Sequence, residues 1–174
     1  MVESYEGLLG KDDLSRGNAL LKLGDTELKL ARYAEAERSL LESLRVCESQ
    51  LGTGHPSSTR IRLQLSTVYY RQQGRSSDAE QHLEQILAIL EQTTGPTTLE
   101  YGETMGSLGF LRSDRGRMVE GRELIVRALD ILRQAVGQTH PEYDLALNNL
   151  AHLAITQQDL NWTAPVCCVV LLKR

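Results

Sequence analysis

The sequence predicts an all-α fold, namely a right-handed superhelical solenoid of helix-turn-helix repeats. Glycines recur at positions 10, 52, 95 and 137, so that the intervals between them are 42, 43 and 42 residues. An apolar stripe with steps of 4, 4, 3 and 4 residues precedes each of the last three glycines. Such steps keep one helical face apolar, and a sustained period of this length is typical of stacked repeats.

The stripe marks the second helix of each repeat. It is clearest before Gly52, where Ala36, Leu40, Leu44, Cys47 and Leu51 share one helical face. Gly52 is expected to end that helix, and Pro56 suits the first turn of the next. The same steps recur in two further sets, which are Ala79, Leu83, Leu87, Leu90 and Thr94 before Gly95, and Gly121, Ile125, Leu129, Leu132 and Val136 before Gly137.

The first helix of each repeat carries a leucine followed by a small residue, always thirteen residues after the repeat glycine. A small side chain allows two helix backbones to approach closely, so we expect these pairs where the two helices of a repeat cross. The pairs are Leu23-Gly24, Leu65-Ser66, Leu108-Gly109 and Leu150-Ala151.

Two irregularities interrupt the pattern. The 43-residue interval has one extra residue, which comparison of the repeats places within Thr67 to Gln73, so a bulge or a looser turn is expected there. The third repeat also contains Gly102 and Gly106, which fall at neither a turn nor an expected crossing. Because each glycine inside a helix costs about 1 kcal/mol relative to alanine, we expect this repeat to be the softest.

A family resemblance rests on these leucine pairs and on three motifs. The motifs are Gly52-Thr53-Gly54-His55-Pro56, Gly137-Gln138-Thr139-His140-Pro141 and Ala146-Leu147-Asn148-Asn149-Leu150-Ala151. Together with the 42-residue period, they resemble the kinesin light chain type of tetratricopeptide repeat over roughly residues 10 to 160. The third repeat departs from the pattern, because Gly95-Pro96-Thr97-Thr98-Leu99 stands where others have His-Pro.

Both ends of the array are expected to be partial repeats. Residues 1–9 have the register of the end of a second helix, and residues 1–160 are expected to hold about three and a half repeats. From Asn161 to Arg174 the apolar spacing is lost and Pro165 interrupts any helix, which predicts an irregular tail. Such a tail could arise from an alternative exon or from a shifted reading frame.

Composition excludes several classes of protein. A net charge of −4 without a basic cluster argues against nucleic-acid binding. No secretory leader or membrane-spanning run is seen, so a cytoplasmic location is expected. Three cysteines without CxxC spacing indicate neither a disulfide framework nor a zinc site. Acylation of Cys167 and Cys168 could bring a membrane contact, whereas the simpler interpretation is an incidental tail.

The sequence favours a non-catalytic protein. His55 and His140 precede prolines in the joining turns, which indicates a structural role. No nucleophile elbow, phosphate-binding loop or paired catalytic carboxylates are seen, and no cofactor or metal is expected. Asn161-Trp162-Thr163 fits the glycosylation pattern by coincidence if the chain is not secreted.

The first helices of such arrays line a concave groove, which we expect to hold a short linear peptide of acidic or mixed charge. In the resembled family, asparagines pair with the peptide backbone and basic residues meet acidic side chains. The expected contacts are Lys22, Arg60, Gln64, Arg71, Asn148, Asn149 and His152. The alternatives are a structural or oligomerisation scaffold, including a homo-oligomer, and a truncated regulatory isoform of a larger repeat protein.

Overall fold

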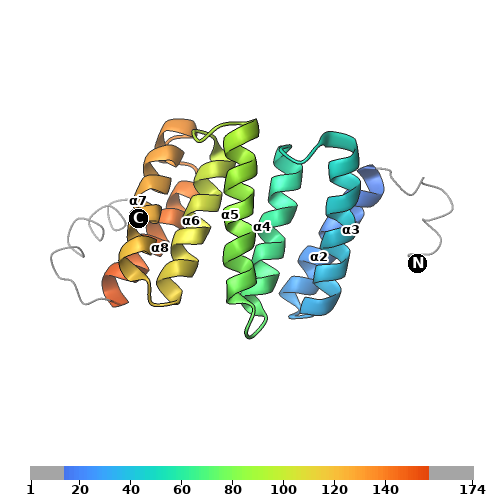
Figure 1. Ribbon diagram of the computed structural model, residues 1–174, viewed down its shortest axis with the longest axis horizontal. Coiled ribbons are helices and arrows are strands. Elements are labelled where there is room, and N and C mark those ends of the chain that lie inside the picture. Colours follow the sequence, from blue (N-terminus) through green and yellow to red (C-terminus); the bar gives the residue numbers. More distant parts are fainter. Residues whose placement is uncertain (1–13, 157–174) are drawn as a thin grey trace. The chain divides into compact units, whose positions relative to one another are not determined.

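The computed structural model describes residues 14–156, and these residues form helices joined by short turns (Figure 1). The all-α, helix-turn-helix expectation is confirmed for this range. The helices are α2 (Leu14–Lys29), α3 (Tyr33–Leu51), α4 (Pro56–Arg71), α5 (Ser76–Thr93), α6 (Leu99–Asp114), α7 (Met118–Ala135) and α8 (Pro141–Thr156). The expected end of a second helix in residues 1–9 and the expected tail from Asn161 lie outside the described residues.

The first helices, α2, α4, α6 and α8, each have 16 residues and begin four residues after a repeat glycine. Each histidine of a His-Pro pair caps the N-terminus of the following helix. His55 Nδ1 accepts a hydrogen bond of 3.1 Å from the Ser57 amide, and His140 Nδ1 accepts one of 3.3 Å from the Glu142 amide. These bonds satisfy an amide that the helix start would otherwise leave unpaired, so the structural role of both histidines is confirmed.

The third repeat starts its first helix by other means. Thr98 stands at the position of the histidine, and its Oγ1 accepts a hydrogen bond of 3.4 Å from the Tyr101 amide. Threonine is a common N-cap because its short side chain reaches back to the exposed amides. The departure from His-Pro therefore changes the capping side chain while the helix still begins at the same register.

The turn glycines adopt the left-handed conformation that only glycine reaches without steric cost. Gly52 ends α3 with a φ of 90°, as predicted. Gly74 and Gly116 occupy the turns between the first and second helices, with φ values of 82° and 83°. In the first repeat the equivalent position is held by Ala31, whose φ is 58°. A non-glycine residue is strained there, because its Cβ approaches the following carbonyl group.

The expected close crossings are confirmed at two glycines. A Cβ atom added to Gly24 would lie 2.7 Å from Leu40 Cγ, and one added to Gly109 would lie 2.8 Å from the carbonyl oxygen of Gly121. We expected no close contact at Gly102, and this was wrong. A Cβ atom added there would lie 2.9 Å from Leu132 Cδ2. Gly106 has room, since the nearest atom to an added Cβ is Ala128 Cβ at 3.7 Å. That the third repeat is the softest stays a prediction.

The extra residue of the 43-residue interval lies in the turn between α4 and α5. This turn has four residues, Gln72 to Arg75, whereas the corresponding turns of the first and third repeats have three. The amide of Gln72 still bonds to the Val68 carbonyl at 3.0 Å, so α4 keeps its regular pattern to its end. The looser turn is confirmed, and there is no bulge in the helix.

The chain divides into two compact units, residues 1–89 and 90–174, with the boundary inside α5. In the first unit α2 packs against α3, and α3 packs against α4. Its core brings together stripe residues of α3 with residues of α2 and α4. The fully or nearly fully buried members are Leu21, Ala36, Leu40, Leu44, Cys47, Ile61, Leu65 and Val68. Leu51, the last residue of the α3 stripe, is exposed.

In the second unit α6 packs against α7, and both contact α8. Ile125 of the α7 stripe packs with Leu150 and Leu153, whereas Leu132 packs with a second group on α8. The apolar stripe of a second helix therefore faces the first helix of the following repeat, as it does between α3 and α4.

Candidate peptide-binding face

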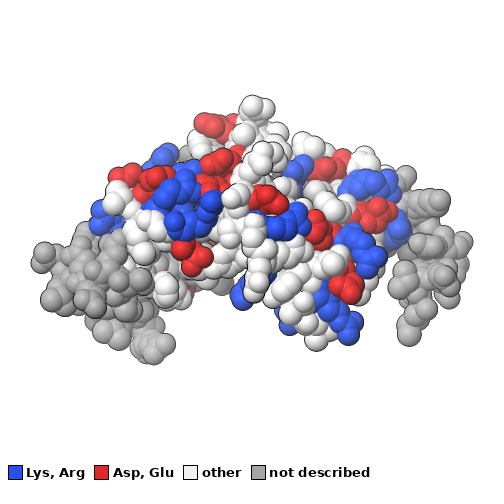
Figure 2. Space-filling model, turned by 60° about the horizontal axis from the view of Figure 1, so that its bottom comes forward, with Lys and Arg blue, Asp and Glu red and all other residues white. Residues whose placement is uncertain are grey.

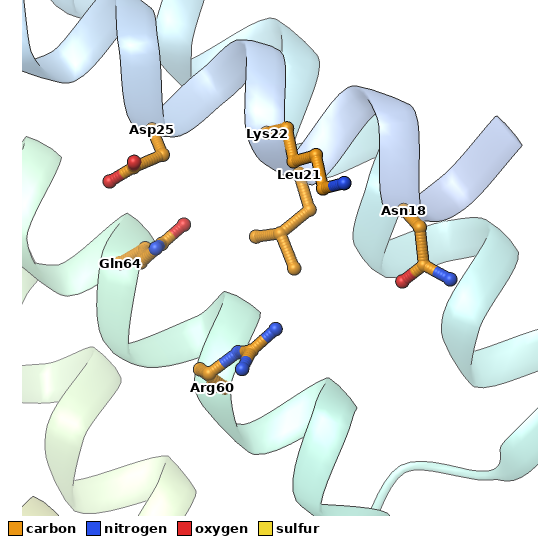
Figure 3. A pocket seen from close by; sticks show the side chains of 6 residues that line it. All are labelled: Asn18, Leu21, Lys22, Asp25, Arg60 and Gln64. Carbon is orange, nitrogen blue, oxygen red and sulfur yellow. The ribbon is translucent and has the colours of Figure 1, made fainter. Parts of the chain in front are cut away.

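A pocket of about 380 Å³ lies in the first unit between two first helices, α2 and α4. It is lined by Asn18, Leu21, Lys22, Asp25, Arg60 and Gln64, and is called the α2–α4 pocket below. Leu21 is 7% exposed and its side chain projects from α2 into the space between the helices (Figure 3). Arg60 and Gln64 extend toward it from α4 (Figure 3). The pocket therefore combines an apolar floor with a polar rim.

The rim has two positive charges available to a ligand. Asp25 is paired with Lys29, whose Nζ lies 2.6 Å from Asp25 Oδ2. Within the described part of the chain, Lys22 and Arg60 make no ion pair, and both are exposed. Because Asp25 is the one carboxylate that lines the pocket and it pairs with Lys29, the rim carries more positive than negative charge and can attract a negatively charged group.

Gln64 contributes an unpartnered polar atom. Its Oε1 is buried, yet no described group donates a hydrogen bond to it. A buried acceptor without a donor costs roughly 1–3 kcal/mol, and a ligand that displaced the groups covering this atom and donated an N–H to it would recover part of that free energy. A peptide backbone supplies such donors at every residue except proline.

Three of the residues expected from the sequence, Lys22, Arg60 and Gln64, thus meet at one pocket. Arg71 is exposed at the end of α4 and does not line this pocket. Asn148, Asn149 and His152 lie on α8 in the second unit, where Asn149 is half-buried and the other two are exposed.

Sequence analysis missed Asn18 and Leu21. Asn18 lies one helical turn before Lys22, so the same spacing that selected Lys22 could have found it. Leu21 looked like an ordinary core leucine, and only the packing of α2 beside α4 shows that its side chain also reaches a pocket.

A second polar cluster lies at the junction of α4 and α5. The Arg75 guanidinium stacks 4.2 Å from the centre of the Tyr69 ring and donates to Glu37 Oε2 at 2.8 Å. Tyr69 meets the His82 ring edge-to-face, with 5.6 Å between ring centres. Burial, followed by the positive charge of Arg62, lowers the pKa of His82. These groups join the helices of the first unit.

The described residues hold no group of three or more His, Cys, Asp or Glu side chains placed to bind a metal. Among helices α2 to α8, none is long and apolar enough to cross a membrane. On the face drawn in Figure 2, basic and acidic side chains are interspersed.

Comparison with known proteins decides the family. A family model described as tetratricopeptide repeat matches residues 3–92, which is just over half of the chain. The chain belongs to the tetratricopeptide repeat family. No curated protein matches its sequence. Folds built from these repeats generally serve as scaffolds for protein–protein interaction, which is the class of function that the family shows.

Solved structures share the fold. One is a protein from Podosopora anserina, assigned as a kinesin light chain with nearly identical TPR-like repeats, at 19% identity and a TM-score of 0.73. The match covers 92% of this chain and 75% of that one. A single-residue variant of that protein gives a TM-score of 0.72 at 19% identity, over 91% and 74% of the two chains.

BtubC (BKLC) from P. vanneervenii matches at 15% identity with a TM-score of 0.72, and the match covers 88% of this chain and 61% of BtubC. The similarity in fold agrees with the kinesin light chain type of repeat that the sequence resembles.

Proposed function

We propose that this tetratricopeptide repeat chain is a non-catalytic adaptor that binds a short linear peptide on the face of its first helices. The α2–α4 pocket carries the proposal. It offers two unpaired positive charges from neighbouring repeats, an apolar floor and a buried acceptor without a donor. An acidic side chain, an adjacent apolar side chain and a backbone amide of one peptide would satisfy all three.

The proposal extends to α8 in the second unit. Asn148 and Asn149 present amides, which can both donate to and accept from a peptide backbone. Together with His152 they are proposed as peptide contacts of the second unit by itself, and Arg71 is proposed as a further contact of the first unit. The charge of the preferred peptide follows from the pocket, so acidic or mixed-charge peptides are expected to be selected over basic ones.

The affinity should be modest, because a disordered peptide loses conformational entropy when it binds. We propose that this binding takes place in the cytoplasm, since the buried thiol of Cys47 is free and a reducing compartment would keep it so.

Binding to an array of short acidic peptides that contain an aromatic residue tests the proposal. The parent chain is compared with a Lys22→Glu, Arg60→Glu variant, which reverses both charges at the pocket. Arg127→Glu makes the same kind of change at an exposed site on α7 and serves as the control. The parent chain and the control are expected to bind acidic peptides selectively. The affinity is expected to fall about tenfold or more only in the pocket variant, since 1.4 kcal/mol corresponds to a factor of ten.

Selective binding that both variants keep would place the ligand elsewhere. No selective binding by a folded protein would reject the peptide adaptor. Size-exclusion chromatography with light scattering would then test the scaffold alternative, because self-association makes the measured mass depend on concentration.

A further inference from the structure

Lys22 and Arg60 stand at positions of the α2–α4 pocket that the fold does not restrict to cations. Arg60 is the fifth residue of its helix and Lys22 is the ninth residue of its own. Elsewhere in the first helices these positions hold neutral or acidic side chains, namely Asn18, Glu103 and Leu145 at the fifth, and Gln64, Ser107 and Asn149 at the ninth. Since α2, α4, α6 and α8 all form with this variety, packing accounts for neither cation.

Little negative charge offsets the two cations. The α4 helix contains three arginines and no aspartate or glutamate. One of them, Arg62, is paired with Glu48 of α3, with 3.0 Å between Nε and Oε1. On the side of α2, Asp25 is the one carboxylate that lines the pocket, and it is paired with Lys29. Two like charges at one opening repel each other, so an anion between them would turn a repulsion into two attractions.

The donors around the opening suit a phosphate group. Among residues 14–156, the side chains of Asn18, Lys22 and Arg60 have no hydrogen-bond or ion-pair partner, and all three line the pocket (Figure 3). Arginine offers a fixed fork of N–H groups, lysine an ammonium group and asparagine an amide. A phosphate on a serine presents three acceptor oxygens and about two negative charges, whereas a carboxylate presents two oxygens and one charge. Phosphate therefore matches the two cations and the amide more closely.

The size and the floor of the pocket favour a phosphorylated side chain over a free anion. Its volume of about 380 Å³ exceeds the space that one small anion fills and lies in the range of about 300–1,000 Å³ that is common for ligand sites. Leu21 forms the apolar floor and offers a free anion no favourable contact. A phosphorylated residue brings carbon atoms to this floor together with its phosphate.

We propose that the α2–α4 pocket prefers a phosphorylated serine or threonine of the bound peptide to an aspartate or glutamate. Lys22 binds the phosphate from α2 and Arg60 binds it from α4, while the Asn18 amide donates a hydrogen bond and Leu21 contacts the side-chain carbons. The inference rests on the proposed adaptor function and adds a mode of regulation to it. Phosphorylation of the partner replaces a neutral hydroxyl group by a doubly charged one, and so strengthens binding.

The acidic peptide array described above tests the preference when each peptide is made in three forms. Its central residue is serine, glutamate or phosphoserine, and affinities for the full chain are measured by fluorescence anisotropy. The phosphoserine form is expected to bind about fivefold more tightly than the glutamate form. This ratio corresponds to one additional exposed ion pair of favourable geometry.

The pocket variants use side chains that the same positions hold in other repeats. Arg60→Leu introduces the residue found at Leu145, and Lys22→Gln introduces the residue found at Gln64. Each is expected to reduce the advantage of phosphoserine over glutamate to about twofold or less. Because both affinities are measured on one variant, their ratio cancels a general loss of binding. Arg127→Leu, at an exposed arginine of α7, is the matched control and should keep the full ratio.

A competition arm separates a phosphopeptide from a free anion. Excess inorganic phosphate is expected to displace the labelled phosphoserine peptide far less effectively than the same peptide without its label, because the free ion makes no contact with Leu21 or with the rest of the groove. Equal displacement by inorganic phosphate would show a site for small anions and would overturn the proposal.

Two other results would overturn the proposal while leaving the adaptor function in place. One is equal affinity of the parent chain for the glutamate and phosphoserine forms of peptides that it binds selectively. The other is an advantage of phosphoserine that both Arg60→Leu and Lys22→Gln retain, which would place the phosphate elsewhere. If a chain shown by circular dichroism to be folded bound none of the three forms, both the adaptor function and this inference would be rejected.

Discussion

Replacing Gly106 by alanine is expected to stabilise the second unit by about 1 kcal/mol. Gly106 lies inside α6, where alanine has the higher helix propensity and loses less backbone entropy on folding. The added Cβ would lie 3.7 Å from Ala128 Cβ and 3.9 Å from Ala146 Cβ, which are ordinary van der Waals distances. The substitution therefore adds contacts without displacing a neighbour.

Gly109→Ala in the same helix is the matched counterpart. It gains the same propensity, but its Cβ would lie 2.8 Å from the Gly121 carbonyl oxygen and 3.1 Å from the Ile125 nitrogen. Both atoms belong to the backbone of α7, so the helices would have to move apart. Overpacking of a close contact commonly costs about 1–3 kcal/mol, and a net destabilisation of about 1–2 kcal/mol is expected after the propensity gain.

Urea unfolding followed by circular dichroism measures both changes in the free energy of unfolding. Because the chain has two compact units, hydrogen exchange of the α6 amides is needed to assign the effect to the second unit. The parent chain also shows by this exchange whether its third repeat is the softest. A Gly106→Ala chain that is less stable than the parent, or a Gly109→Ala chain that is as stable, would refute the packing argument for α6 and α7.

Two further predictions concern the first unit. Ala31→Gly should stabilise this unit by roughly 0.5–1 kcal/mol, because it removes the backbone strain of φ 58°. Gly74→Ala at the equivalent turn should destabilise the unit by about 1 kcal/mol. Thermal unfolding of the two variants and the parent measures both changes. If Ala31→Gly lowers the melting temperature, the turn is not strained. Because burial lowers the pKa of His82, the neutral ring is favoured in the folded chain, and stability should fall as the pH drops below about 6.5, where the unfolded chain takes up a proton. Urea midpoints at about pH 7 and about pH 5.5 measure this fall, which should be smaller in His82→Gln; an equal fall in both chains would contradict the assignment.

The sequence predicted the helix order because each repeat glycine and each apolar stripe has a local physical cause. A positive φ at Gly52 and a small residue at Gly24 are requirements of one turn and one crossing, so they leave a mark in the spacing. Gly102 was misjudged because its constraint is the side chain of Leu132, which reaches it only when α7 packs on α6. Spacing within one repeat carries no signal of that contact.

The candidate site was predictable only where helical register determines which residues share a face. Helical register placed Arg60 and Gln64 on one face of α4, since residues one turn apart point the same way, and Lys22 holds the position of Gln64 in the repeat before. The missing donor for Gln64 Oε1 could not be predicted. It depends on which groups the fold leaves without a neighbour, and that is a property of the assembled helices.

The junctions between repeats have a consequence for how such a chain can change in length. Gly52, Gly95 and Gly137 have φ values of 90°, 88° and 85°, and a first helix begins four residues after each of them. A gene duplication or deletion whose breakpoints fall at any two of these glycines would recreate the same junction. The array could thus gain or lose a whole repeat without requiring a new turn, which makes unequal recombination an accessible route to longer or shorter relatives.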